Sequence, residues 1–305
     1  MSKNGMISSL IDIRNAFLVE VSIGIPANAI LLLFHILMFL LKHRPKPTDL
    51  TIGHLALIHL VMLIIIGVIA MDVFASQQQW DDITCKAVIF SYQVMRGLSL
   101  CNTSLLSVLQ AITLSPRSSW LAKFKQTSTH HSLHSFFFIW VFNLSMSAHL
   151  LISTVATTNH TSNSFMFITK SCSRWPLNYL LRNIFYTLGI FRDVSLTGLM
   201  ALSSAYMVTL LCRHRRQSQH LHSTSPSPRA SPELRATRII LLLTSVFVLL
   251  YLIDCIVYSF SGIWWENDPV RLCVHILIGN GYATIAPLLL TSSEKRMITF
   301  FKSMW

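Results

Sequence analysis

The stretch that decides the fold covers residues 85–114 and reads CKAVIFSYQVMRGLSLCNTSLLSVLQAITL. It is long enough to cross the ~30 Å hydrocarbon core of a bilayer as one helix. A cation inside such a helix costs about 3 kcal/mol or more, so Arg96 should face a partner or a wet cavity. Polar residues recur on the same helical face, and we call this set the polar seam: Tyr92, Arg96, Ser99, Thr103, Ser107 and Gln110. A membrane helix with one polar face predicts a bundle built around an interior site.

The composition of the whole chain agrees with a membrane protein. Of its 305 residues, 52% are hydrophobic and only 12% are charged, about half the charged share of soluble domains. Seven apolar runs are long enough to span a bilayer, roughly residues 17–41, 52–71, 85–114, 135–156, 183–212, 239–262 and 272–290. The predicted fold is therefore an all-α seven-transmembrane helix bundle, one domain over residues 1–305.

The basic residues predict the orientation of this bundle. The connections after the first, third, fifth and seventh runs, with residues 42–48, 115–134, 213–238 and 291–305, hold fifteen Lys and Arg. The alternate segments, residues 1–16, 72–84, 157–182 and 262–271, hold six. Because basic residues concentrate in cytoplasmic loops, we expect an extracellular N-terminus and a cytoplasmic C-terminus.

The formal charge of +12 follows largely from this topology. It favours contact with anionic inner-leaflet lipid and gives no reason to expect a nucleic-acid partner. The inner segment 213–238 contains Ser-Pro repeats and is predicted to be a flexible loop. Arginines stand at both of its ends, namely Arg213, Arg215, Arg216, Arg235 and Arg238. Each alone suits membrane-edge anchoring; together they suit docking of a partner protein.

Two of the six cysteines, Cys85 and Cys172, fall on the predicted outer side, where disulfides form. A bridge between them would tie the third span to the loop after the fourth and close a lid over a cavity; two free thiols are the alternative. The same loop carries the triplet Asn159-His160-Thr161, a predicted glycosylation site. Matching triplets at Asn102 and Asn143 lie inside predicted spans, so we expect no glycan there.

Few ionisable residues lie inside the predicted spans. Arg96, Asp193 and Asp254 fall at depths where one outward-facing cavity would lie, and Arg192 and Asp193 are placed near the outer surface. One hypothesis is that one of the two acids neutralises Arg96 and that a ligand perturbs the pair; a static salt bridge is the alternative. Aromatic residues such as Tyr92 and Tyr258 suit a small, mainly hydrophobic ligand.

Several blocks of the sequence resemble vomeronasal type-1 receptors. The blocks include residues 95–101 (MRGLSLC), 105–112 (LLSVLQAI), 115–120 (SPRSSW), 211–214 (LCRH) and 279–284 (GNGYAT). They occur in the order and spacing of that family, over residues 24–296 or nearly the whole chain.

The resemblance implies a G-protein-coupled receptor for pheromones or odorants that acts through an inhibitory-class G protein. It also implies the Cys85–Cys172 bridge of the wider rhodopsin-like group. That group's acid-Arg-aromatic triplet is replaced here by Leu109-Gln110-Ala111, so its activation switch cannot be transferred. The candidates for ligand contact are Tyr92, Arg96, Ser99, Asp193, Asp254, Tyr258 and Asn280. The candidates for G-protein contact are Arg117 and the five arginines at the ends of the 213–238 loop.

Two other classes of protein compete with this interpretation. A bitter-taste receptor shares the missing triplet, but the outer cysteine pair and the quoted blocks argue against it. A transporter or channel would need charged relays or inverted repeats that the sequence lacks. The sequence has no phosphate loop, nucleophile elbow or metal-ligand spacing, so we expect no enzymatic activity and no cofactor.

Overall fold

The computed structural model describes residues 3–41, 47–74, 79–116, 119, 129–157, 166–167, 169, 171–174, 178–221, 232–263 and 269–293. Seven long helices run along the molecule within these ranges: α1 (Lys3–Leu41), α2 (Pro47–Phe74), α3 (Asp82–Leu114), α4 (Thr129–Ser147), α6 (Tyr179–Leu221), α7 (Pro232–Ile263) and α8 (Pro269–Ser293). One helical turn, α5 (Leu150–Ser153), leads into an antiparallel sheet of β1 (Thr154–Ala156), β2 (Met166–Phe167) and β3 (Cys172–Arg174), in the order β1-β3-β2.

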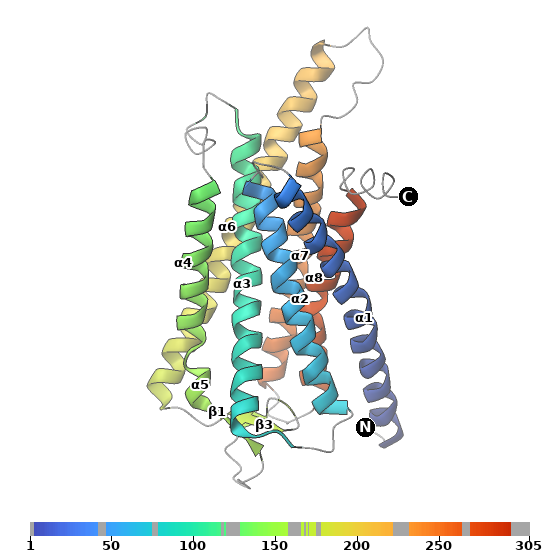
Figure 1. The fold of residues 1–305 in the computed structure, drawn as a ribbon, viewed down its shortest axis with the longest axis vertical. Coiled ribbons are helices and arrows are strands. Elements are labelled where there is room, and N and C mark those ends of the chain that lie inside the picture. The colour runs from blue at the N-terminus through green and yellow to red at the C-terminus, as the bar shows by residue number, and fades with distance from the viewer. Residues whose placement is uncertain are drawn as a thin grey trace.

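The two ends of the bundle differ (Figure 1). One end carries the start of α1, the start of α3 and the sheet, and there a disulfide joins Cys85 of α3 to Cys172 of β3, as predicted. We call it the disulfide end. The opposite end carries the ends of α1, α3 and α6 and the start of α7.

The helices have the lengths and surfaces of membrane spans. Within the described ranges, α1, α2, α3, α4 with α5, and α6 are long and apolar enough to cross a bilayer, while α7 and α8 contribute shorter apolar stretches, Arg238–Ile253 and Ile276–Thr291. Large apolar side chains such as Leu18, Leu33 and Phe191 remain exposed on outer faces, where lipid would cover them.

Helix α3 lies at the centre of the bundle. In the apolar stretch of α3, 67% of the residues are buried, compared with 11% of those in the apolar stretch of α6. It packs against α2, α4, α6 and α7. Because a central helix faces neighbours on all sides, its polar residues must find partners inside the protein.

Acidic side chains hold the sheet onto α2 and α3. Asp72, which is buried near the end of α2, accepts hydrogen bonds from the backbone N–H and the hydroxyl of Ser171, at 3.1 and 2.5 Å. Asp82, at the start of α3, accepts a hydrogen bond from the backbone N–H of Ala156 at 2.6 Å. Together with the disulfide, these contacts fix the sheet over the α2 and α3 corner of the bundle.

The helix boundaries differ from the predicted apolar runs for local reasons. Helix α3 begins at Asp82 because Asp81 caps it and accepts a hydrogen bond from the backbone N–H of Thr84 at 3.0 Å. Hydrogen bonds with Thr84 also hold the pKa of the exposed Asp81 carboxyl below its ordinary value. The predicted span 135–156 stops as a helix at Ser147 and continues as α5 and β1.

The predicted flexible loop 213–238 is shorter in the structure. Helix α6 continues through residue 221 and α7 begins at residue 232, so helix covers both ends of that segment. Hydropathy marks where a helix leaves the apolar layer, and charged residues such as arginine form helix well beyond that point. Pro232 is the first residue of α7, where a missing backbone N–H costs little.

A proline in α8 explains one contact between α1 and α8. Pro287 has no N–H, so the carbonyl of Ala283, four residues earlier, lacks its helical partner. The side-chain amide of Asn28 in α1 donates to this carbonyl at 2.9 Å and to the carbonyl of Gly24 at 2.8 Å. A buried asparagine therefore replaces the lost helical bond and joins the two helices.

Candidate functional site

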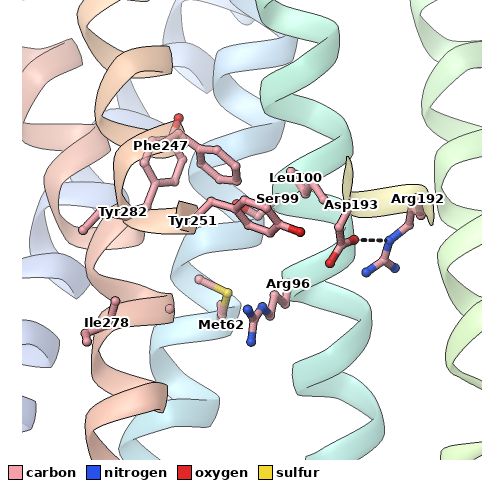
Figure 2. A pocket seen from close by; sticks show the side chains of 12 residues that line it. Met62, Arg96, Ser99, Leu100, Arg192, Asp193, Phe247, Tyr251, Ile278 and Tyr282 are labelled. Atoms are coloured by element: carbon pink, nitrogen blue, oxygen red, sulfur yellow. Dashed lines mark hydrogen bonds and ion pairs between the residues drawn. The ribbon is translucent and has the colours of Figure 1, made fainter. Parts of the chain in front are cut away.

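A small cavity lies between α2, α3, α6, α7 and α8 (Figure 2). Arg96, which lines the cavity, lies eleven residues along α3 from Cys85, a distance of about 16 Å along the helix axis. Its volume of about 40 Å³ suffices for a few water molecules. A drug-sized ligand needs several hundred Å³, so side chains lining the cavity must move to admit one.

Ser99 of α3 belongs to the polar part of the cavity wall and connects it to residues of α2 and α8. Ser99 lines the cavity, and its hydroxyl lies 2.8 Å from Nε2 of the buried His59 in α2. The His59 ring stands perpendicular to the ring of Tyr282, with centroids 5.4 Å apart. Tyr282 in turn stands perpendicular to Phe247, at 4.5 Å. A ligand that displaces Ser99, Tyr282 or Phe247 would therefore disturb contacts in the core of the bundle.

The rest of the wall is mainly apolar. Met62 comes from α2, Leu100 from α3, Phe247, Leu250 and Tyr251 from α7, and Ile278 and Gly279 from α8. Such a lining, with a few polar groups at fixed places, is typical of sites for small hydrophobic molecules.

A charged cluster forms the side of the cavity toward α6. Nε of Arg192 donates to Oδ1 of Asp193 at 2.7 Å, and its Nη1 donates to Oδ1 of the buried Asn143 in α4 at 3.3 Å. Gly97 of α3 faces this junction: an added Cβ would collide with the Asn143 side chain and lie 2.9 Å from Nη1 of Arg192. The absence of a side chain at Gly97 is what lets α4 and α6 meet here.

The two acids predicted as possible partners of Arg96 are Asp193 and Asp254. Asp193 forms its ion pair with Arg192, its neighbour in the sequence, while Arg96 lines the cavity below them (Figure 2). The backbone of Asp254 lies in α7. Its side chain is outside the described residues, so pairing between Arg96 and Asp254 stays a prediction.

Tyr92 and Asn280 were both predicted to contact ligand. Neither belongs to the cavity lining; instead they bond to each other between α3 and α8, with Nδ2 of Asn280 donating to the Tyr92 hydroxyl at 3.0 Å. Nδ2 of Asn280 also donates to the carbonyl of Ile276 at 2.5 Å. In this conformation the pair joins two helices, and ligand contact by it remains a prediction.

Other predicted site residues fall partly or wholly outside the described structure. The side chain of Tyr258, in α7, and the side chains of Arg215 and Arg235 are not described, and Asn159 and Arg117 lie outside the described residues. Asn102 and Asn143, whose triplets were not expected to carry glycans, are fully buried.

The opposite end of the bundle has an open cleft of about 790 Å³ between the end of α3 and the end of α6. Arg213 and Arg216 line it, beside Tyr206 and Cys212. The hydroxyls of Tyr206 and Ser115, 2.8 Å apart, join the two helices there. Arg238 is also exposed, near the start of α7. Three of the arginines predicted to face a G protein are thus exposed, two of them in one cleft.

Arg192, Asn143 and Gly97 were not among the predicted site residues. Arg192 was expected near the outer surface. Because α6 begins at Tyr179, thirteen residues of helix, or about 20 Å, precede Arg192. The available signal was a charged dipeptide, residues 192–193, inside an apolar stretch.

Comparison with known proteins identifies the family. The profile of the vomeronasal organ pheromone receptor family matches residues 11–303. "Vomeronasal type-1 receptor 90" of Rattus norvegicus is 52% identical over 304 residues, with 100% of this chain and 98% of that protein covered. "Vomeronasal type-1 receptor 100" of Rattus norvegicus is 50% identical, with 100% and 93% covered. "Vomeronasal type-1 receptor A11" of Mus musculus is 49% identical, with 99% and 95% covered. The chain therefore belongs to the vomeronasal organ pheromone receptor family, a family of seven-transmembrane plasma-membrane receptors and not of enzymes.

Proposed function

We propose that this receptor binds a small, mainly hydrophobic pheromone or odorant in the cavity between α2, α3, α6, α7 and α8, and activates an inhibitory-class heterotrimeric G protein. Membership of the family implies a small-molecule ligand and a G-protein partner in general. The observation that supports a small, mainly hydrophobic ligand is the cavity itself, which combines an apolar and aromatic lining with a few polar and charged side chains, namely Arg96, Ser99, Arg192 and Asp193.

The proposed orientation places the disulfide end outside the cell. The distribution of basic residues supports it, because the connections at the opposite end hold most of the Lys and Arg. In this orientation Asn159 is available for glycosylation, and the cleft with Arg213 and Arg216 faces the cytoplasm. We assign that cleft to the G protein, with anionic inner-leaflet lipid at the surrounding arginines.

The small volume of the cavity has a mechanistic consequence. A ligand must displace side chains such as Tyr251 and Phe247 of α7 and Tyr282 of α8. Helices α7 and α6 both reach the opposite end, so a shift of α7 at the cavity changes its packing beside the basic cleft. Binding that favours the shifted arrangement would open the cleft to the G protein.

The test uses full-length receptor with an N-terminal tag. Antibody staining of unpermeabilised cells should detect the tag, and a panel of volatile and steroid-like molecules should contain ligands that cause saturable dissociation of an inhibitory-class G protein. Arg96→Ala should abolish or shift that response while surface staining persists. Staining only after permeabilisation would refute the orientation, and dissociation confined to another G-protein class would refute the inhibitory assignment.

A further inference from the structure

We infer that Arg192 is the polar anchor of the cavity and binds a hydrogen-bond-acceptor oxygen on an otherwise apolar ligand. The inference rests on the proposed function, because it names the chemistry of the ligand for the same cavity.

Arg192 has more hydrogen-bond donors than its contacts in the protein use. A guanidinium carries five N–H groups. Nε donates a hydrogen bond to Asp193, and one hydrogen of Nη1 is donated to Asn143. Among the residues that the structure describes, none accepts a hydrogen bond from Nη2. Yet the Arg192 side chain is only 8% exposed. Because Arg192 lines the cavity, Nη2 can donate to an acceptor that enters it, and a hydrogen bond to a charged group in such a shielded place is a strong one.

The contacts of Arg192 hold its guanidinium group at Nε and Nη1. A purely structural arginine would typically pair with a carboxylate through two parallel hydrogen bonds. Here the contact with Asp193 runs through Nε alone, and Asn143 takes one hydrogen of Nη1. These contacts fix the plane of the guanidinium and leave Nη2 free to donate. The bare backbone of Gly97 provides the space in which this arrangement fits.

The remainder of the cavity wall indicates the chemistry of the rest of the ligand. Beyond the charged cluster and Arg96, the wall consists mostly of aliphatic and aromatic side chains such as Leu250, Tyr251 and Ile278. A ligand that fits both parts has an apolar skeleton with a carbonyl or a carboxylate at one end. Both groups offer the acceptor oxygen that Nη2 requires, and a carboxylate adds charge pairing.

The experiment measures binding to purified full-length receptor in detergent or nanodiscs. Four probes share one carbon skeleton: octane, octan-2-one, octanoate and octylammonium. In the wild type we expect octan-2-one and octanoate to bind more tightly than octane, and octylammonium to show no such gain. Arg192→Gln should weaken the two oxygen-bearing probes by about 10- to 100-fold, the loss typical of a hydrogen bond to a charged group, and leave octane within about twofold. A loss restricted to octanoate would assign a carboxylate, and a loss for both probes would assign any acceptor oxygen.

Matched variants separate anchoring from folding. Arg192→Lys keeps the charge but not the planar guanidinium, so it should weaken binding of the oxygen-bearing probes to an intermediate degree. It replaces Arg192→Gln in the test if that variant fails to fold. Gly189→Ala, on the same helix, is the neutral control because an added Cβ there meets nothing within 4 Å. Equal losses for octane and octan-2-one would overturn the inference. So would a wild-type receptor that binds neither oxygen-bearing probe.

The same preparation distinguishes failure of the anchor from failure of the proposed function. Nucleotide exchange on an inhibitory-class G protein is recorded alongside binding. Coupling that persists while Arg192→Gln leaves probe binding unchanged would refute the anchor alone. Binding that depends on Arg192 without any coupling would refute the G-protein assignment and support the anchor.

Discussion

The polar seam of α3 follows one regular helical spacing in the sequence, but its two halves have different surroundings in the structure. Toward the disulfide end, Arg96 and Ser99 line the cavity, and the neighbouring Gly97 makes room for Arg192. Toward the opposite end, Ser107 lies 2.6 Å from the Ser203 hydroxyl of α6. The Thr103 hydroxyl donates to the Ser99 carbonyl at 2.8 Å and lies 3.5 Å from the Tyr282 hydroxyl. We call these the cavity half and the packing half.

The difference shows that helical periodicity reveals which face is polar but not what that face meets. In the packing half, α6 approaches closely enough for hydroxyls to bond each other, so no space remains. In the cavity half, Arg96 and Ser99 border a space that the surrounding side chains do not fill. Mutations of the residues in the cavity half that line the cavity, Arg96 and Ser99, should therefore change ligand response, whereas mutations in the packing half should change stability alone.

The largest expected effect comes from Gly97→Ala. The added methyl group would overlap Asn143 and crowd Nη1 of Arg192, and overpacking of this kind typically costs about 1–3 kcal/mol. We expect a lower melting temperature of the purified receptor together with a loss of ligand response. Gly198→Ala in α6, where an added Cβ meets nothing within 4 Å, is the matched control. An unchanged response in Gly97→Ala would show that the charged cluster is not part of the ligand site.

Much of the fold could be predicted from the sequence because it follows from hydropathy. Apolar runs predicted seven spans, and the cysteines at 85 and 172 form the disulfide that the resemblance implied. The end of α6 and the start of α7 could not be placed, since polar residues continue a helix beyond the apolar stretch. The ion pair of Asp193 with Arg192 could not be predicted, because the burial of Arg192 depends on how α4 and α6 pack around Gly97. Neither helix reveals that packing by itself. Arg96 and Ser99 were predicted as site residues because they lie on the polar seam, and both line the cavity. Tyr92 lies on the same seam but bonds Asn280 of α8.

Ser99→Ala tests the boundary between the two halves, because Ser99 both lines the cavity and bonds His59. Removing the hydroxyl leaves Nε2 of a buried histidine without this partner, at a cost of about 1–3 kcal/mol. We expect a decrease in melting temperature and a shift in ligand potency in the same variant. Thr113→Ala, an exposed residue of α3, is the control. A change in stability without any change in potency would move Ser99 into the packing half.

Tyr92→Phe tests whether position on the seam is enough to make a residue part of the ligand site. Tyr92 lies toward the disulfide end but bonds Asn280 and does not line the cavity. The loss of its hydroxyl should cost about 0.5–1.5 kcal/mol, the usual range for one hydrogen bond. Thermal melting should register this loss while the concentration for half-maximal response stays within about twofold. A tenfold or larger shift in that concentration would support the prediction that Tyr92 contacts ligand.

The smallest effect is expected for Ser107→Ala, in the packing half. Hydrogen bonds between membrane helices average about 0.6 kcal/mol. The cost here should not exceed that value, because the hydroxyl of Ser203 keeps acceptors at the carbonyls of Leu199 and Met200, at 2.9 and 3.0 Å. A double-mutant cycle of Ser107→Ala and Ser203→Ala, followed by thermal melting, isolates the coupling between the two hydroxyls. Ligand potency should be unchanged in all three variants, since neither serine lines the cavity. A potency shift in Ser107→Ala as large as that in Ser99→Ala would mean that the two halves act as one unit, and that the division drawn from the structure describes packing without describing function.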